Sequence, residues 1–111
     1  LIRLVCQDCK EAYEPTKEQL AELGIRTDLI YRPKGCGKCN HIGYRGRMPI
    51  AEMMVVDKEI RELIGRRAQF QELRKAAVAA GMETLLHSGI RKVEKGLTSL
   101  EEVISVTMGM E

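Results

Sequence analysis

Two pairs of cysteines, each with two residues between its members, constrain this 111-residue chain more than any other feature. Cys6 and Cys9 form the first pair, and Cys36 and Cys39 form the second. With two intervening residues, both thiolates of a pair can face one ion, and two pairs complete a tetrahedral shell of four sulfurs with no open position. The pattern therefore predicts one structural zinc ion per chain, bound by all four cysteines.

Other uses of the four cysteines fit the sequence less well. A disulfide framework would leave residues 40–111 without a cross-link, because every cysteine lies before them. A thioredoxin-type redox pair needs a βαβ context that the sequence lacks. Iron bound as in rubredoxin uses the same ligands and stays open as an alternative. His41 could replace one thiolate, but four sulfurs already saturate the ion, so we expect it to be an ordinary loop residue.

Composition excludes some functional classes. The chain carries 18 basic and 16 acidic side chains, and aromatic residues make up only 4% of it. This near balance argues against a protein dedicated to nucleic acid. No apolar run approaches the roughly 20 residues that a membrane-spanning helix needs. Because the first residue is leucine within an apolar run, we expect the chain to be a piece of a longer protein.

The hydrophobic pattern predicts an α+β fold in two parts. Residues 1–56 are expected to form a small tetracysteine zinc-binding module with a short helix and short strands. Residues 57–111 are expected to form an all-helical C-terminal subdomain of four helices. In the first part, Thr16 followed by Gln19 predicts a capping box at the start of the helix, and residues 28–33 are expected to be a short strand.

Residues 48–56 are predicted to be the main strand of the first part. They are apolar on both faces, so we expect this strand to be buried between layers. Pro49 cannot donate a ladder hydrogen bond, which places the strand at an edge or delays its start. For Glu52, which falls among these apolar residues, two interpretations stay open. Either it pairs with Arg45 or Arg47, or the strand is an edge and its carboxylate faces water.

Capping residues mark the first and last helices of the second part. Asp57 is predicted to cap the first of the four helices. Thr98 with Glu101 is predicted to form a capping box for the last helix, which would turn Leu100, Val103 and Ile104 inward.

Basic residues gather around the second cysteine pair, where Asp28 is the one acidic residue among Arg26, Arg32, Lys34, Lys38, Arg45 and Arg47. Four thiolates around a divalent ion leave a net negative charge, so this positive charge either compensates the cluster or attracts an anionic partner. The shortage of aromatic residues here disfavours single-stranded nucleic acid. We expect charge compensation together with a protein partner. The candidate contact residues follow or flank glycines that permit tight turns, and they are Tyr44, Arg45 and Arg47.

Three stretches of the chain carry a specific combination of motifs. They read LIRLVCQDCKEAYEP at the start, GCGKCNHIGYRGRMPIAEMM in the middle and VEKGLTSLEEVISVT near the end. Together they resemble the C-terminal region of the ATPases that drive type II secretion and type IV pilus assembly. The combination of paired C-x2-C motifs, a G-Y-x-G-R strand entry and a closing G-x-T-S-x-E-E-V helix is specific, and it spans nearly the whole chain. The chain departs from the pattern at Pro49, where many relatives have glycine.

The resemblance implies a RecA-like motor that precedes this region and works as a hexamer. It also implies that the final helices of this chain pack against that motor. It implies Cys6, Cys9, Cys36 and Cys39 as zinc ligands. The implied partners are the motor, neighbouring subunits and an inner-membrane platform protein, with the parent in the cytoplasm and peripheral to the inner membrane. No G-x4-G-K-[ST] loop and no strand ending in paired acids occurs in the chain. We therefore expect no catalytic residue here, with ATP and Mg²⁺ bound only by the motor.

The predicted function is a non-catalytic zinc-binding module that stabilises a long insertion and contacts membrane-platform partners. Two alternatives stay open. A nucleic-acid-binding zinc ribbon would bind in a strongly salt-dependent manner. A freestanding zinc-stabilised protein-interaction domain would lack the motor.

Overall fold

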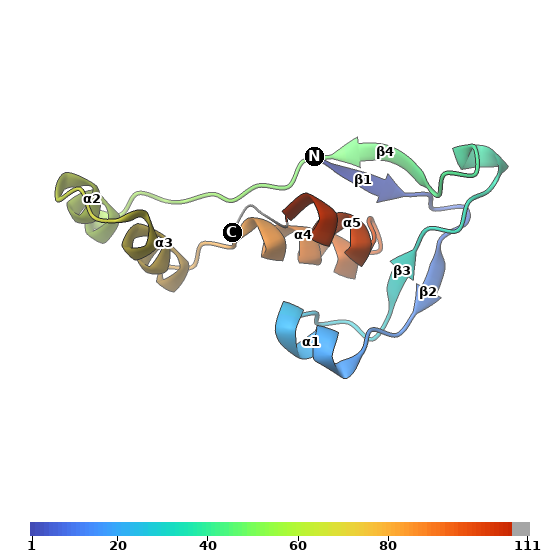
Figure 1. The fold of residues 1–111 in the computed structure, drawn as a ribbon, viewed down its shortest axis with the longest axis horizontal. Helices are drawn as coiled ribbons and strands as arrows, with labels where there is room; N and C mark the ends of the chain where they lie inside the picture. The colour runs from blue at the N-terminus through green and yellow to red at the C-terminus, as the bar shows by residue number, and fades with distance from the viewer. Residues whose placement is uncertain (108–111) are drawn as a thin grey trace. The chain divides into compact units, whose positions relative to one another are not determined.

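Four short strands form two separate antiparallel pairs in the computed structural model, which describes residues 1–107 (Figure 1). β1 (Ile2–Val5) pairs with β4 (Tyr44–Met48), and β2 (Glu11–Tyr13) pairs with β3 (Ile30–Arg32). Four helices follow these strands along the chain, so the predicted α+β class is confirmed, as is the strand expected at residues 28–33. A ribbon of two strands is marginally stable alone, so each pair depends on what packs against it.

The first helix, α1 (Lys17–Leu23), begins at the predicted capping box. The Gln19 amide N–H donates to Thr16 Oγ1 (3.1 Å), and the Thr16 amide N–H donates to Gln19 Oε1 (3.0 Å). Gly24 ends the helix in the left-handed region, with φ +66°. Each contact involves residues close in sequence, which is why the pattern alone located this helix.

The main core lies where α4 (Leu85–Glu94) and α5 (Leu100–Thr107) pack side by side (Figure 1). Its buried members come from both helices, from β3 and from the segment after α1: Ile25, Ile30, Ile90, Val93, Leu100 and Val103. Gly89 lies at the contact between the two helices. A Cβ atom at this position would lie only 2.5 Å from Val103 Cγ1. The absence of a side chain on Gly89 therefore sets how closely α4 and α5 approach.

The prediction of a strand at residues 48–56 is wrong. β4 ends at Met48, immediately before Pro49, and residues 49–56 have no regular structure. Met53 and Val55 are each 75% exposed, so the segment is not buried between layers within the described part of the chain. Proline explains the end of the strand, because it has no N–H to donate to β1.

Glu52 has a cationic partner that neither interpretation of the sequence considered. Arg74 Nη1 lies 2.7 Å from Glu52 Oε1, and both side chains are 27% exposed. Arg74 comes from α3 (Phe70–Ala79), which is distant in sequence. A half-buried carboxylate thus pairs with a cation supplied by the tertiary structure.

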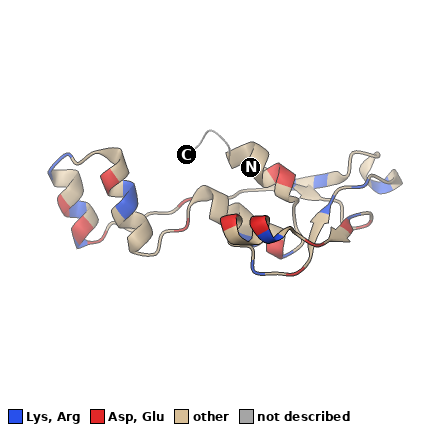
Figure 2. Ribbon diagram, turned by 60° about the horizontal axis from the view of Figure 1, so that its bottom comes forward, with Lys and Arg blue, Asp and Glu red and all other residues tan. Residues whose placement is uncertain are grey.

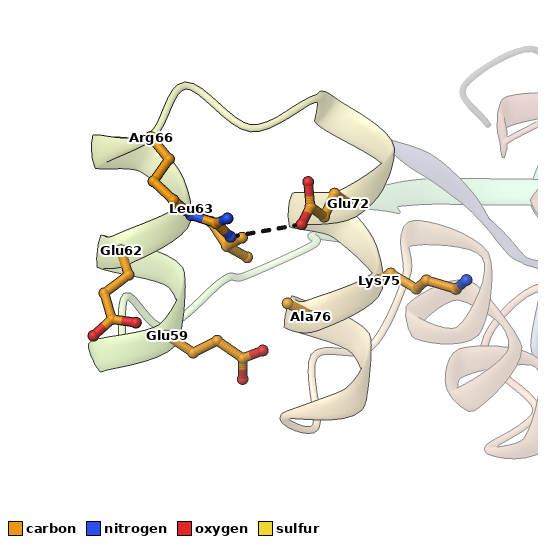
Figure 3. Close-up of a pocket in the computed structure, with 7 residues that line it drawn as sticks. All are labelled: Glu59, Glu62, Leu63, Arg66, Glu72, Lys75 and Ala76. Atoms are coloured by element: carbon orange, nitrogen blue, oxygen red, sulfur yellow. Dashed lines mark ion pairs between the residues drawn. The ribbon is translucent and has the colours of Figure 1, made fainter.

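The hairpin of α2 (Lys58–Gly65) and α3 has few buried residues, and they are Ile60, Leu63 and Ala77. In α2, Asp57 caps the helix as predicted, because its Oδ1 accepts the Ile60 amide N–H (2.8 Å). Charged residues of both signs lie along α2 and α3 (Figure 2). They line an open cavity of about 450 Å³ between the helices (Figure 3). There Arg66 Nη2 lies 3.6 Å from Glu72 Oε1, an exposed pair that contributes less than about 1 kcal/mol.

The chain divides into two compact units, and the division differs from the expected domains 1–56 and 57–111. The first unit combines residues 1–50 with the chain from residue 85 on, and the second is 51–84. Helices α4 and α5 belong with the cysteine-bearing part because their apolar faces pack on the core around β3. Residues 108–111 of the expected helical part lie outside the described residues. Within residues 1–107, no helix has both the length and the apolar character required to cross a bilayer.

The cap of α5 lies one residue later than predicted. Ser99 Oγ accepts the Glu102 amide N–H (3.1 Å). The Thr98 hydroxyl donates instead to the carbonyl oxygen of Arg3 (2.7 Å). The Thr98 hydroxyl is thus turned towards β1, and the predicted capping box of Thr98 and Glu101 does not form among the described residues.

Glu102 joins α5 to β1 through Arg3. Its Oε2 accepts the Arg3 backbone N–H (2.7 Å), and its Oε1 accepts from Arg3 Nε (3.1 Å) and Nη2 (2.9 Å). The Glu102 side chain is only 6% exposed. The Arg3 guanidinium also lies 4.2 Å from the centre of the Tyr44 ring. Such a charge-assisted bidentate pair fixes both the position and the orientation of α5 on the hairpin.

Replacing Glu102 with glutamine should lower the free energy of unfolding by about 2 kcal/mol at neutral pH, because hydrogen bonds to a charged group are lost. Burial opposes ionisation of Glu102, but the hydrogen bonds from Arg3 lower its pKa below the usual value. A lowered pKa in the folded state gives stability that is present above the unfolded pKa and is lost as the pH falls through the folded value. The difference between variant and parent should therefore be the same near pH 6 and near pH 8, both above the unfolded pKa, as measured by urea unfolding of the metal-loaded protein. Glu101→Gln, at an exposed neighbour, serves as the control; equal effects of both changes would contradict the assignment.

Candidate metal centre

The four cysteines lie where the chain passes between the two strand pairs. Cys6 follows β1, and the chain then enters β2 through Cys9. Cys36 precedes η1 (Gly37–Cys39) and Cys39 ends it, and the chain returns from β3 to β4 through this turn. Since β1 pairs with β4 and β2 with β3, both connections cross the same junction between the two ribbons. Two cysteine pairs that are distant in sequence are thereby brought together.

The sulfur positions fit one tetrahedral ion. All four Sγ atoms lie within 4.8 Å of one another. The Sγ–Sγ separations are 3.9 Å for Cys6 and Cys36, 3.9 Å for Cys9 and Cys39, and 3.8 Å for Cys36 and Cys39. A tetrahedron with metal–sulfur bonds of about 2.3 Å has edges of about 3.8 Å. All four cysteines are free, and these separations are far longer than a disulfide bond of about 2.05 Å.

Backbone N–H groups point at the sulfurs. Gly35 donates to Cys9 Sγ (3.2 Å), whereas Cys36 (3.2 Å) and Gly43 (3.3 Å) donate to Cys39 Sγ. Burial raises the pKa of the Cys9 thiol to about 11, against the hydrogen bond from Gly35. Burial acts in the same direction on Cys39, but the hydrogen bonds from Cys36 and Gly43 lower its pKa to about 6. These donors stabilise negative charge on sulfur, which a metal-binding thiolate requires.

Two glycines allow the second connection to fold tightly. Gly35 has φ +106°, and a Cβ atom there would lie 2.8 Å from the carbonyl oxygen of His41. Gly43 has φ +89°, and a Cβ atom there would lie 2.5 Å from Pro33 Cβ. His41 is an exposed turn residue and is not one of the clustered metal-ligating side chains found among residues 1–107. This agrees with the expectation that it is an ordinary loop residue.

Part of the basic charge near the site is neutralised by acids from the first half of the chain. Lys34 Nζ lies 3.5 Å from Glu11 Oε1, and Lys38 Nζ lies 3.5 Å from Asp8 Oδ1. These two acidic residues lie outside residues 26–47 and come close to the second cysteine pair only in the folded chain. Arg32 lies over the ring of Tyr13, with 4.1 Å between its Cζ atom and the ring centre.

The three candidate contact residues on β4 differ in their surroundings. The Tyr44 hydroxyl is 2.6 Å from Ser99 Oγ, and its ring is half-buried beneath Arg3. Arg45 and Arg47 are exposed, and neither belongs to an ion pair found within residues 1–107. The structure thus separates a tyrosine that supports α5 from two arginines that face solvent.

Comparison with known proteins finds related sequences that cover nearly the whole chain. The family model described as "Type II/IV secretion system protein" matches residues 1–105. The chain is 44% identical to the type II secretion system ATPase E of Vibrio cholerae, over 96% of this chain and 22% of that protein. It is 39% identical to the type IV pilus assembly ATPase PilB of Thermus thermophilus, over 97% of this chain and 13% of that protein. It is 40% identical to the type IV pilus assembly ATPase PilB of Myxococcus xanthus, over 96% of this chain and 20% of that protein. The chain therefore spans about a fifth or less of the length of these relatives.

Proposed function

The chain belongs to the type II/IV secretion system protein family, and from this membership we propose that it is the non-catalytic, zinc-binding C-terminal module of a hexameric ATPase that powers type II secretion or type IV pilus assembly. The observation that carries the proposal is the convergence of four thiols, from two distant segments, to within 4.8 Å in a chain that resembles these ATPases. In this proposal the module gives the parent a rigid surface rather than a reacting group.

Zinc is the proposed ion because a closed shell of four cysteine sulfurs is typical of structural zinc sites. Iron can use the same ligands, and metal analysis distinguishes the two. A bound ion would supply folding free energy by joining Cys6 and Cys9 to Cys36 and Cys39. That role suits the fold, because two ribbons of two strands have little core of their own at the junction they share.

We assign ATP and Mg²⁺ to a RecA-like motor in the part of the parent that this chain does not span. The apolar segment 53–56 supports a contact with that part. Its side chains range from 36% exposed at Met54 to 75% exposed at Met53 and Val55. Contiguous exposed apolar side chains are characteristic of surfaces that another protein segment covers. Neighbouring subunits of the hexamer would lie against the same module.

Arg45 and Arg47 are the proposed contacts for an inner-membrane platform protein, with the Tyr44 ring beside them. Both arginines are exposed on a short strand, without an ion-pair partner among the described residues. Arginine pairs efficiently with carboxylates at interfaces, so an acidic surface on the platform would be complementary. Through such a contact the parent would be held at the cytoplasmic face of the inner membrane without being inserted in it.

Replacing both Arg45 and Arg47 with glutamate in the full-length parent tests this role. We expect secretion or pilus assembly to fall by about tenfold or more, because like charges would then face each other across the contact. ATP hydrolysis in solution should stay within about twofold of the unchanged protein, since no catalytic group is altered. Arg61→Glu with Arg67→Glu, two exposed arginines of the second unit, provides a control with the same change in charge. Full assembly by the Arg45/Arg47 variant would refute the platform contact.

A further inference from the structure

The loop that carries the first cysteine pair is hydrogen-bonded to the turn between α4 and α5. Gln7 Nε2 donates to the carbonyl oxygen of Gly96 (3.0 Å), and Lys10 Nζ donates to the same oxygen (3.1 Å). The Val5 amide N–H donates to the carbonyl oxygen of Leu97 (2.9 Å). Gln7 lies between two metal-ligating cysteines, and Lys10 directly follows the second.

Gly96 fits closely against this loop. Its φ of +74° favours glycine, and a Cβ atom there would lie 2.9 Å from Lys10 Nζ and 3.1 Å from Tyr31 Cε2. Lys10 Nζ in turn lies 4.0 Å from the centre of the Tyr31 ring. The ammonium group is therefore held between an aromatic face and a carbonyl oxygen, which fixes the turn relative to the loop.

The residues just after the turn anchor α5 to the β1–β4 hairpin. The Thr98 hydroxyl donates a hydrogen bond to the Arg3 carbonyl oxygen, and the Ser99 hydroxyl is hydrogen-bonded to the Tyr44 hydroxyl. Glu102 accepts three hydrogen bonds from Arg3. A continuous chain of contacts therefore runs from the first cysteine pair, through Gly96, to the start of α5.

We propose that metal occupancy of the four-cysteine site controls the docking of the α4–α5 turn, with Gln7 and Lys10 as the residues that couple the two. The inference rests on the proposed metal binding. With Cys6 and Cys9 held by an ion, the short loop has few conformations, and both donors stay at the Gly96 carbonyl oxygen. Without the ion the loop gains conformational freedom, and the two hydrogen bonds are lost together. The coupling is reciprocal, so the docked turn also strengthens metal binding.

The test is amide hydrogen exchange at residues 97–103 in the full-length protein loaded with zinc. The double variant Gln7→Ala with Lys10→Met should exchange there about tenfold faster than the unchanged protein, because two hydrogen bonds are lost. Its zinc content should stay at one ion per chain, while its dissociation constant for zinc rises several-fold. Lys38→Met is the matched control, because Lys38 lies in the second cysteine pair, contacts Asp8 and should leave exchange at residues 97–103 unchanged.

Each result decides a different question. Unchanged exchange at residues 97–103 in a double variant that holds one zinc ion overturns this inference alone. Absence of bound metal in the unchanged protein, even after zinc is added, overturns both the inference and the proposed function. If the double variant does not fold, Gly96→Ala disturbs the same contact from the side of the turn, and the same acceleration is expected. Normal exchange and normal zinc affinity in Gly96→Ala would then refute the coupling.

Discussion

Replacing Cys39 with serine should abolish tight metal binding and unfold the first unit. Cys39 is 4% exposed, and its Sγ accepts two backbone N–H groups besides facing the other thiols. Structural zinc sites supply about 10–16 kcal/mol of binding free energy, which matches or exceeds the whole stability of a typical domain. Loss of one ligand should therefore leave the unit without a cooperative unfolding transition. A chelator should have the same effect on the unchanged chain.

The tyrosines make this unit easy to observe. All three, Tyr13, Tyr31 and Tyr44, lie in the first unit, and the chain has no tryptophan. Tyrosine near-ultraviolet circular dichroism therefore reports its packing, and elemental analysis reports the metal. His41→Asn is the control, since asparagine tolerates the positive φ of 61° and His41 is not a proposed ligand. A Cys39→Ser variant with full metal content and an unchanged thermal transition would exclude the four-sulfur site.

Replacing Gly89 with alanine should destabilise the first unit by about 2 kcal/mol net. Alanine within a helix normally stabilises a protein by roughly 0.5–1 kcal/mol relative to glycine. Here the new methyl group would lie 2.5 Å from Cγ1 and 3.0 Å from Cγ2 of Val103, a buried and stiff side chain. Overpacking of this kind costs about 1–3 kcal/mol and forces α4 and α5 apart. Chemical denaturation followed by the tyrosine signal measures the change.

Gly37→Ala is the matched control for this prediction. Gly37 lies in η1 of the same unit, its φ is not positive, and a Cβ atom there would have no neighbour within 4 Å. The same substitution should therefore leave stability unchanged or slightly raised. A smaller loss from Gly89→Ala in the Val103→Ala background than in the parent would locate the clash at that contact. A Gly89→Ala variant as stable as the parent would show that the two helices do not pack this closely.

Features that depend on neighbouring residues could be read from the sequence. The capping box of Thr16 and Gln19 formed as predicted, and so did the cap at Asp57. The cysteine spacing predicted a metal site, and the four side chains are indeed brought together. Each cap depends on residues a few positions apart. The metal site depends on paired cysteines, a pattern that is typical of structural zinc sites.

Other features depend on partners that are distant in sequence. The apolar pattern of residues 48–56 indicated a need for burial, but a strand also requires a neighbouring backbone, and the described chain supplies none after Met48. The α5 cap lies at Ser99, whereas Thr98 donates to Arg3, and Glu52 pairs with a cation on α3.

The four cysteines of the candidate metal site, the α+β class and the starts of α1 and α2 could be predicted from the sequence, because local spacing and side-chain chemistry decide these. The union of α4 and α5 with the cysteine-bearing unit, and the contact between the first cysteine pair and the α4–α5 turn at Gly96, became visible only in the folded chain. Such contacts depend on which apolar faces find each other in space, and residue spacing carries no information about that choice.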